Sequence, residues 1–264
     1  MRVDLHNHTT LCNHATGTTQ EYIEKAITLG IDIYGFSEHA PMHFDQKYRL
    51  QLQDKELYEN DIRSLQQKYQ KDIKILLGYE VDYLEGDYIL SEVINSKVDY
   101  LIGSVHFLKQ NNTQWGFDNP EFIGHYKNTN IDKIWEDYFL AIKNMAKSGR
   151  FDIVGHLDLI KVFKFLPKKD IKTLALETLK AIKKANMVVE INAAGYRKPI
   201  AEQYPSKELL ELCFELDIPI TFSSDAHSVD QVGFKYEEAT TLAKEIGYTK
   251  CTYFEQREKT QINF

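Results

Sequence analysis

Short apolar segments alternate with longer amphipathic segments along most of the chain, and this alternation restricts the possible folds more than any other feature. The apolar segments have the length and composition of strands, whereas the amphipathic segments repeat with the period of a helix. We expect strands at residues 3–8, 31–39, 73–83, 98–106, 151–156, 187–193 and 218–227. We expect helices at residues 19–30, 54–71, 132–148, 171–185, 207–217 and 236–246.

Strands that alternate with long helices usually pair in parallel, through right-handed crossovers. Seven such units predict an α/β fold of the (β/α) barrel kind, distorted or incompletely closed. An open, doubly wound sheet is the alternative. No Ser/Gly-rich linker and no shift in composition divides the 264 residues, so we expect a single domain that spans residues 1–264.

The composition limits the binding partners and the cell compartment that we expect for this protein. A net charge of −7 repels polynucleotides, so we expect no nucleic acid as a partner, although a small phosphate compound remains possible as a ligand. Three scattered cysteines are too few for a disulfide framework and fit a reducing compartment. No apolar run approaches the ~20 residues of a membrane span, and histidines replace an N-terminal signal segment, so we expect a cytoplasmic protein.

Seven of the nine histidines gather where predicted strands end. Those at or near such ends are His6, His8, His14, His39, His106, His156 and His227. Three acidic residues, Glu80, Glu190 and Asp225, accompany them. Because the loops after parallel strands converge on one face, these side chains predict one polar site at the C-terminal ends of the strands. His43 and His125 fall outside the pattern, and we assign them to loops or the surface.

The spacing of these residues favours metal binding over separate structural roles. Residues i and i+2 of a strand face the same side, so His6 and His8 can reach one ion, and Asp225 and His227 have the same spacing. A lone histidine at a strand end is more often structural, but seven together are not explained in that way. Imidazoles and carboxylates suit Zn, Mn or Fe(II), and they are too numerous for one ion, which implies two or three.

Two further residues near this site have competing interpretations. Cys12 could be a soft metal ligand, although a small buried loop residue is the stronger interpretation. Glu190 lies in an apolar strand, where an unpaired carboxylate is costly. We therefore expect Glu190 to pair with a cation or to support a metal-binding histidine.

Seven motifs together resemble the polymerase and histidinol phosphatase (PHP) family, in order from residue 4 to about residue 227. They are LHNHTTLCNHATG, SEHAPM, GYEVDY, GSVHFL, GHLDLI, EINAAGYRK and SSDAH. The SVHF–WGFDNPE stretch and the EINAAGYRK segment resemble the histidinol-phosphate phosphatase branch. The resemblance implies a distorted (β/α)7 barrel that holds three divalent ions, with Zn, Mn and Fe all acceptable.

The resemblance also implies which side chains hold each ion. For the first ion these are His6, His8, Glu80 and Asp225. For the second ion they are Glu80, as a bridge, with His106 and His156. For the third ion they are His14, His39 and His227. Glu38 departs from the family pattern, in which Asp often precedes this histidine, and we expect the change to affect only the surroundings of the ligands.

The activity implied by the resemblance is hydrolysis of L-histidinol phosphate, a phosphate monoester of histidine biosynthesis. We expect a metal-bridging hydroxide as the nucleophile, so the reaction needs no phosphoenzyme.

Arg197 is the candidate phosphate clamp, with a solvated surface arginine as the alternative, and Lys198 and Lys161 are weaker candidates. For the organic end of the substrate we expect aromatic and acidic side chains from the loop after the fourth strand, namely Trp115, Phe117, Asp118 and Glu121. Trp115 and Phe117 could instead pin this loop to the barrel.

Two other functions compete with this one. Another phosphoesterase of the same family, a phosphodiesterase or a nuclease for short oligonucleotides, is the first, and the acidic charge weighs against the nuclease. A metal-binding module without catalysis is the second, and the complete set of candidate ligands weighs against it. The oligomeric state and the group that protonates the leaving oxygen are left open.

Overall fold

Seven parallel strands form one sheet, in which spatial order follows chain order. They are β1 (Val3–Asp4), β2 (Ile33–His39), β3 (Lys74–Asp82), β4 (Tyr100–Ser104), β7 (Ile153–Val154), β8 (Val188–Asn192) and β9 (Ile220–Ser223). The structure is a computed structural model that describes residues 1–86, 88–110 and 113–264.

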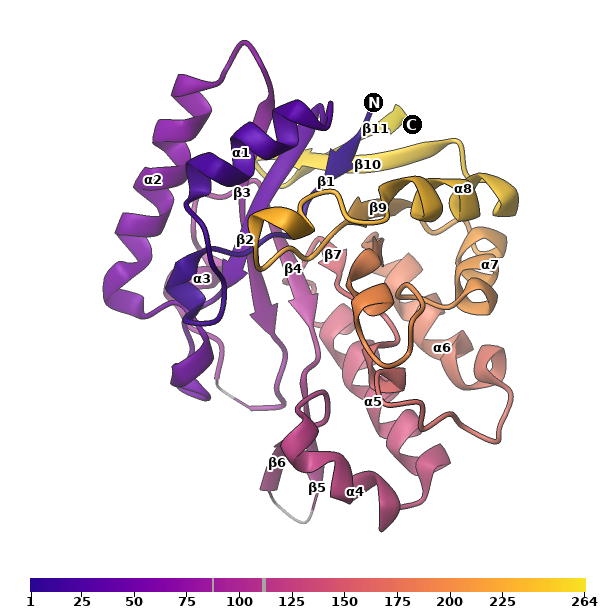
Figure 1. Ribbon diagram of the computed structural model, residues 1–264. Coiled ribbons are helices and arrows are strands. Elements are labelled where there is room, and N and C mark those ends of the chain that lie inside the picture. The colour runs from indigo at the N-terminus through magenta and orange to yellow at the C-terminus, as the bar shows by residue number, and fades with distance from the viewer. Residues whose placement is uncertain (87, 111–112) are drawn as a thin grey trace.

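The two edges of this sheet meet. The backbone N–H of Leu5 donates to the carbonyl of Phe222 over 3.1 Å, and Asn7 and Ala226 form a parallel bridge. The sheet is therefore a nearly closed barrel rather than an open one, as Figure 1 shows, and the prediction of an α/β barrel is confirmed.

Helices cover the outside of the barrel at the predicted places. They are α1 (Thr19–Thr28), α2 (Lys55–Lys68), α5 (Ile131–Lys147), α6 (Ile171–Lys184), α7 (Lys207–Glu215) and α8 (Tyr236–Ile246). Local signals set their starts: Thr18 and Glu21 form a capping box before α1, and Asp170 caps α6 through the N–H of Thr173. Among the described residues between β3 and β4, the only helix is the short α3 (Ser91–Ile94). Within the described part of the chain, no helix combines the length and apolarity that a membrane crossing requires.

Successive side chains of a strand point to opposite faces, which gives one apolar region under the helices and another inside the barrel. On β3, Ile75, Leu77 and Tyr79 face the helices, whereas Leu76 belongs to the second cluster, inside the barrel. Tyr100 crosses this interior and donates to the carbonyl of Leu5 over 2.6 Å. Gly35 makes room for it, because a Cβ there would lie 2.1 Å from the Tyr100 hydroxyl. The interior is thus filled with side chains and is not a pore.

Two hairpins lie outside the predicted elements. The first, β10 (Lys250–Glu255) with β11 (Glu258–Asn263), lies against the N-terminal ends of the strands (Figure 1), where the N–H of Arg257 donates to Asp99 just before β4. The second, β5 (Phe107–Gln110) with β6 (Thr113–Gly116) and the following α4 (Ile123–Lys127), replaces the loop expected after the fourth strand. Residues 111 and 112 of that loop lie outside the described residues.

Four strands end earlier than predicted, before the residues of the candidate site. The first strand stops at Asp4, the fourth at Ser104, the fifth at Val154 and the seventh at Ser223. Beyond them the backbone of His156 and Asp225 adopts positive φ values of 22° and 51°. Such conformations are costly for residues other than glycine and tend to occur at functional sites, where the surrounding structure holds them.

Candidate metal centre

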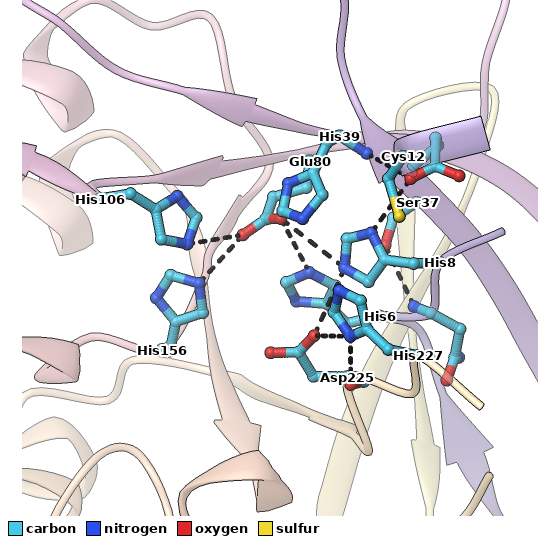
Figure 2. Close-up of polar contacts among 12 residues, drawn as sticks. His6, His8, Cys12, Ser37, His39, Glu80, His106, His156, Asp225 and His227 are labelled. Carbon is cyan, nitrogen blue, oxygen red and sulfur yellow. Dashed lines mark hydrogen bonds and ion pairs between the residues drawn. The ribbon is translucent and has the colours of Figure 1, made fainter. Parts of the chain in front are cut away.

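The structure brings all nine side chains predicted as metal ligands to the C-terminal mouth of the barrel. Ligand atoms of three groups lie within 4.8 Å of one another: His6, His8 and Asp225; Glu80, His106 and His156; His14, His39 and His227. Glu80 lies between the first two groups (Figure 2), with His106 and His156 on one side of it. These groups correspond to the three implied sets, except that the first lacks Glu80, and two further groups, His8 with Cys12 and His227 and His8 with His39 and Glu80, overlap them.

One backbone contact aligns both ends of the chain at this site. The parallel bridge between Asn7 and Ala226 makes the side chains next to them point to the opposite side. These neighbours are His6 and His8 beside Asn7, and Asp225 and His227 beside Ala226. The i, i+2 argument therefore holds, although neither segment lies within a named strand.

The carboxylate of Glu80 is shared between two groups. Its Oε2 lies 3.3 Å from His6 Nε2 and 2.8 Å from His39 Nδ1. Its Oε1 lies 2.9 Å from His156 Nε2 and 3.6 Å from His106 Nε2. Burial alone would raise the pKa of Glu80, but the charges of His6 and His39 help hold it well below its ordinary value. An ionised carboxylate with one oxygen on each side has the geometry of a bridge between cations.

His39 belongs to two groups. It lies with His14 and His227, but also with His8 and Glu80, through its contact with Glu80 Oε2. His39 could therefore bind either of two ions, whereas the sequence resemblance assigned it to the third ion alone.

Most of these histidines are oriented by an acceptor on Nδ1. Glu190 Oε1 lies 2.7 Å from His6 Nδ1, and the carboxylate of Asp82 contacts His106 Nδ1. Carbonyl oxygens take the same place for His14 and His227. An Nδ1–H that is donated in this way leaves the lone pair of Nε2 free for a metal ion.

The atoms left over converge on the centre of the site. His6 Nε2, His8 Nε2, His227 Nε2 and Glu80 Oε2 are buried and make no hydrogen bond among the described residues, although ion-pair contacts join Glu80 Oε2 to His6 and His39, and His8 Nε2 to Asp225. Buried polar atoms without partners are rare and need an explanation. Nitrogen and oxygen donors without paired thiolates are the set that Zn, Mn or Fe(II) accepts, so the residues fit divalent metal ions.

Three histidines, His6, His8 and His106, hold protons strongly in the metal-free protein. Burial opposes the protonated form of His6, but the charges of Glu190 and Glu80 raise its pKa well above the ordinary value. Burial opposes the protonated form of His8, but Asp225 and Glu38 raise its pKa to about 9. Burial also opposes the protonated form of His106, but the charge of Asp82 and other carboxylates raise its pKa to about 10. A cation that binds here therefore has to displace protons.

This proton binding predicts a pH-dependent stability of the metal-free protein. The unfolded chain releases the protons of His8 and His106 near pH 6.5, whereas the folded one retains them to about pH 9 and about pH 10. Between these limits the folded state binds more protons, so stability falls as pH rises. We expect the thermal midpoint in excess chelator to fall from pH 7 to pH 10. The metal-loaded protein should show a smaller fall over this range, and equal falls in both forms would contradict the prediction.

The contacts of the other candidate residues near the cluster indicate the role of each. Cys12 Sγ donates to Thr9, and burial raises the pKa of its thiol, which disfavours a thiolate ligand even though His8 and His227 lie within reach. Glu190 accepts from the N–H of His156 over 2.7 Å besides contacting His6, so it supports histidines as expected. His43 is exposed and His125 stacks on Trp115, so both lie outside the cluster.

Two adjoining cavities open beside the cluster. The first, of about 470 Å³, is lined by seven of the nine candidate ligands, all but His6 and His8, together with Asp118, Arg197, Lys198 and Tyr204. The second, of about 350 Å³, shares His14, His39, His106 and Asp118 with the first and adds aromatic side chains. A larger cavity of about 650 Å³ lies beside Trp135, and none of the nine candidate ligands lines it.

The structure corrects several predicted contacts. Trp115 and Phe117 are buried in the hydrophobic core and line neither cavity, so they anchor the hairpin to the barrel. Glu121 is exposed, and Asp118 is the residue of this loop that reaches both cavities. Lys161 is buried in ion pairs with Asp158 and Glu202, which exclude it as a phosphate clamp.

The support of His106 by Asp82 gives a testable effect. Arg49 Nη2 holds the other oxygen of Asp82 over 2.8 Å, so the carboxylate cannot turn away. Asp82→Asn should lower metal affinity by about 10- to 100-fold, measured by competition with a chromophoric chelator. Asp152→Asn is the control, because Asp152 pairs with Arg257 at the opposite end of the barrel. Equal metal affinities of both variants would refute the support by Asp82.

Comparisons with known proteins agree with the fold and the site. The family model of the PHP domain matches residues 4–194. A relative from Deinococcus radiodurans, named "Probable histidinol-phosphatase", is 36% identical over 254 residues, which cover 95% of this chain and 95% of that protein. The histidinol-phosphatase of Bacillus subtilis is 30% identical and covers 89% of this chain and 96% of its own. The solved structure of histidinol phosphate phosphatase from Lactococcus lactis, 22% identical, has a TM-score of 0.79 over 98% of both chains. This chain therefore belongs to the PHP domain family.

Proposed function

We propose that this protein is a phosphatase that hydrolyses L-histidinol phosphate to L-histidinol and phosphate, with three divalent metal ions at the described cluster. The observation that carries the proposal is the pair of adjoining cavities, one beside the candidate ligands and one lined by aromatic and acidic side chains. The names of the Deinococcus and Bacillus relatives support this substrate. The Lactococcus protein, whose fold is shared, was solved with zinc, L-histidinol and phosphate.

The first cavity suits the phosphate. Arg197 lies on its wall and donates through Nη2 to the carbonyls of Ser224 and Asp225, each over 2.9 Å. Its Nη1 is buried without a partner among the described residues. Burial lowers the pKa of this guanidinium, yet arginine remains charged at neutral pH, so Nη1 is a cationic donor for a phosphoryl oxygen.

The second cavity suits the organic end, which carries an ammonium group and an imidazole. Its walls include Phe44, Tyr48, Phe107 and Phe122. Asp45 and Asp118 add carboxylates, and Asp118 lies where the two cavities adjoin. Aromatic faces and carboxylates are the groups that bind a cationic heteroaromatic molecule.

Bound divalent ions would supply a water molecule of lowered pKa and neutralise the phosphoryl oxygens. The protein itself orients the imidazoles through Glu190, Glu38 and Asp82 and holds the phosphate through Arg197. Cys12, the cysteine nearest the site, is buried, and burial raises the pKa of its thiol, so it is a poor nucleophile. We therefore expect direct in-line attack without a covalent phosphoenzyme.

Replacement of Arg197 tests whether its guanidinium binds the phosphate. Arg197→Ala should lower kcat/KM for histidinol phosphate by about 10²- to 10³-fold, as for other preorganised donors. Because Nη2 also holds the carbonyl of Asp225, metal content must be measured in the same sample, and we expect it to be unchanged. Arg257→Ala, at the other end of the barrel, should leave kcat/KM unchanged. A mild effect of Arg197→Ala with full metal content would exclude Arg197 as the clamp.

Steady-state kinetics with elemental analysis test the function as a whole. We expect kcat/KM for histidinol phosphate to exceed that for a nucleotide diester, and the active sample to contain three divalent ions per chain. Preferred hydrolysis of the diester would favour the phosphodiesterase or nuclease alternative. A metal-replete sample that hydrolyses neither ester would favour a non-catalytic module.

A further inference from the structure

The hydroxyl groups of the buried tyrosines differ in a way that singles out two of them. Most donate a hydrogen bond to a carbonyl or carboxylate oxygen, as do Tyr22, Tyr58, Tyr79, Tyr100, Tyr126, Tyr138 and Tyr248. Only Tyr34 and Tyr204 have a buried hydroxyl without a partner among the described residues. Phenylalanine would pack equally well at such a position without leaving a polar atom unpaired.

The surroundings of these two hydroxyls are different. Tyr34 belongs to the outer hydrophobic cluster and packs edge-on against Phe36, with 5.3 Å between the ring centroids. Tyr204 lines the cavity of about 470 Å³ beside the candidate metal ligands. Its ring lies edge-on to that of His156, with 6.4 Å between the centroids. Of the two tyrosines, only Tyr204 lines the cavity in which phosphate would bind under the proposed function.

The backbone and side-chain packing hold Tyr204 in this place. Its N–H donates to Asn192 over 2.9 Å, and the N–H of Asn192 donates back over 2.7 Å, which ties it to the end of β8. Gly195 allows the close approach, because a Cβ there would lie 2.0 Å from the carbonyl of Glu202 and 3.0 Å from Tyr204 Cε2. The ring is thus pre-positioned, as an efficient hydrogen-bond donor must be.

Tyr204 shares the cavity with a second unpaired donor, Arg197 Nη1. Burial, together with the charges of Asp158 and Asp118, raises the pKa of Tyr204, so its hydroxyl remains protonated and can donate. One cationic and one neutral donor beside a metal cluster match the several oxygens of a phosphoryl group.

We propose that Tyr204 is a further catalytic residue, whose hydroxyl donates a hydrogen bond to the phosphoryl group of the substrate beside Arg197. The inference rests on the proposed function, because it requires a phosphate ester in this cavity. The hydrogen bond strengthens as negative charge on the phosphoryl oxygens shifts in the transition state, and no proton needs to leave Tyr204.

The test compares Tyr204→Phe with Tyr34→Phe, which removes the other unpaired buried hydroxyl away from the cavity. Tyr204→Phe should lower kcat/KM for histidinol phosphate by about 10²-fold and weaken binding of inorganic phosphate to the metal-loaded protein, measured by titration calorimetry. Metal content should stay the same, and the thermal midpoint should stay the same or rise. Tyr34→Phe should change neither kcat/KM nor phosphate affinity.

The readouts separate failure of this inference from failure of the proposed function. Phosphate binding can be measured even when histidinol phosphate is not hydrolysed. A wild-type protein that binds phosphate but does not hydrolyse this ester would overturn the proposed function alone. Wild-type kcat/KM and phosphate affinity in Tyr204→Phe would overturn the role of Tyr204. A lowered thermal midpoint together with lost metal would also overturn it, because the hydroxyl would then have a structural role.

Discussion

Replacement of Glu80 by glutamine is expected to lower kcat for histidinol phosphate by at least about 10³-fold, more than the loss expected for Tyr204→Phe. Each carboxylate oxygen of Glu80 faces a different group of histidines, as Figure 2 shows. Glutamine keeps one oxygen but places an NH₂ group against the other histidines and removes the negative charge. Both changes oppose the binding of one cation on each side of this side chain.

Kinetics and elemental analysis of the same Glu80→Gln sample check this expectation. We expect the metal content to fall below that of the wild type, with the remaining metal unable to restore turnover. Glu56→Gln is the control, because Glu56 is exposed on α2, outside the barrel mouth. Near-normal turnover of Glu80→Gln with a full metal complement would show that Glu80 does not bridge.

Removal of the metal ions should have an effect at least as large. Dialysis against a strong chelator should lower turnover by about 10³-fold or more, because metal ions contribute several kcal/mol to the stabilisation of such transition states. The barrel should remain folded, since its apolar clusters and strand pairing do not depend on the metal site. Circular dichroism of the chelated protein checks this point.

Stepwise return of metal would then count the ions. Zn, Mn and Fe(II) are added separately, and turnover is plotted against bound metal per chain. We expect turnover to saturate only when about three ions are bound, because the nine candidate ligands divide among three of the overlapping groups of ligand atoms. Saturation at one ion, or full turnover in the chelated protein, would contradict the proposed centre.

Much of the fold and of the candidate site could be predicted from local patterns. The seven strands and six long helices follow from alternation and helical periodicity, and both depend on residues close together in the chain. Paired spacings, such as His6 with His8, identify side chains that share a face without any knowledge of tertiary contacts. All nine predicted ligands therefore lie together at the barrel mouth.

The wrong predictions concern side chains whose tertiary neighbours make them unavailable for binding a substrate. Trp115 was an attractive contact for a cationic substrate by residue type, yet burial places it in the core, and Asp118 three residues later reaches the cavities instead. Lys161 has the charge for a phosphate clamp but is neutralised by two acidic side chains. Residue type indicates what a side chain can bind, but its neighbours determine what remains available to bind.

The order of strands and helices, the barrel class and the set of polar residues at the strand ends follow from the sequence alone, because they depend on short-range periodicity. The roles of those residues depend on tertiary contacts: Glu80 faces two groups, Asp82 and Glu38 orient histidines, and the hydroxyl of Tyr204 and Nη1 of Arg197 lack partners among the described residues. Most of these relations join residues from different strands or loops, such as Glu80 with His156 or Asp82 with His106. They arise only when the strands pair in the barrel, and no local pattern encodes those contacts.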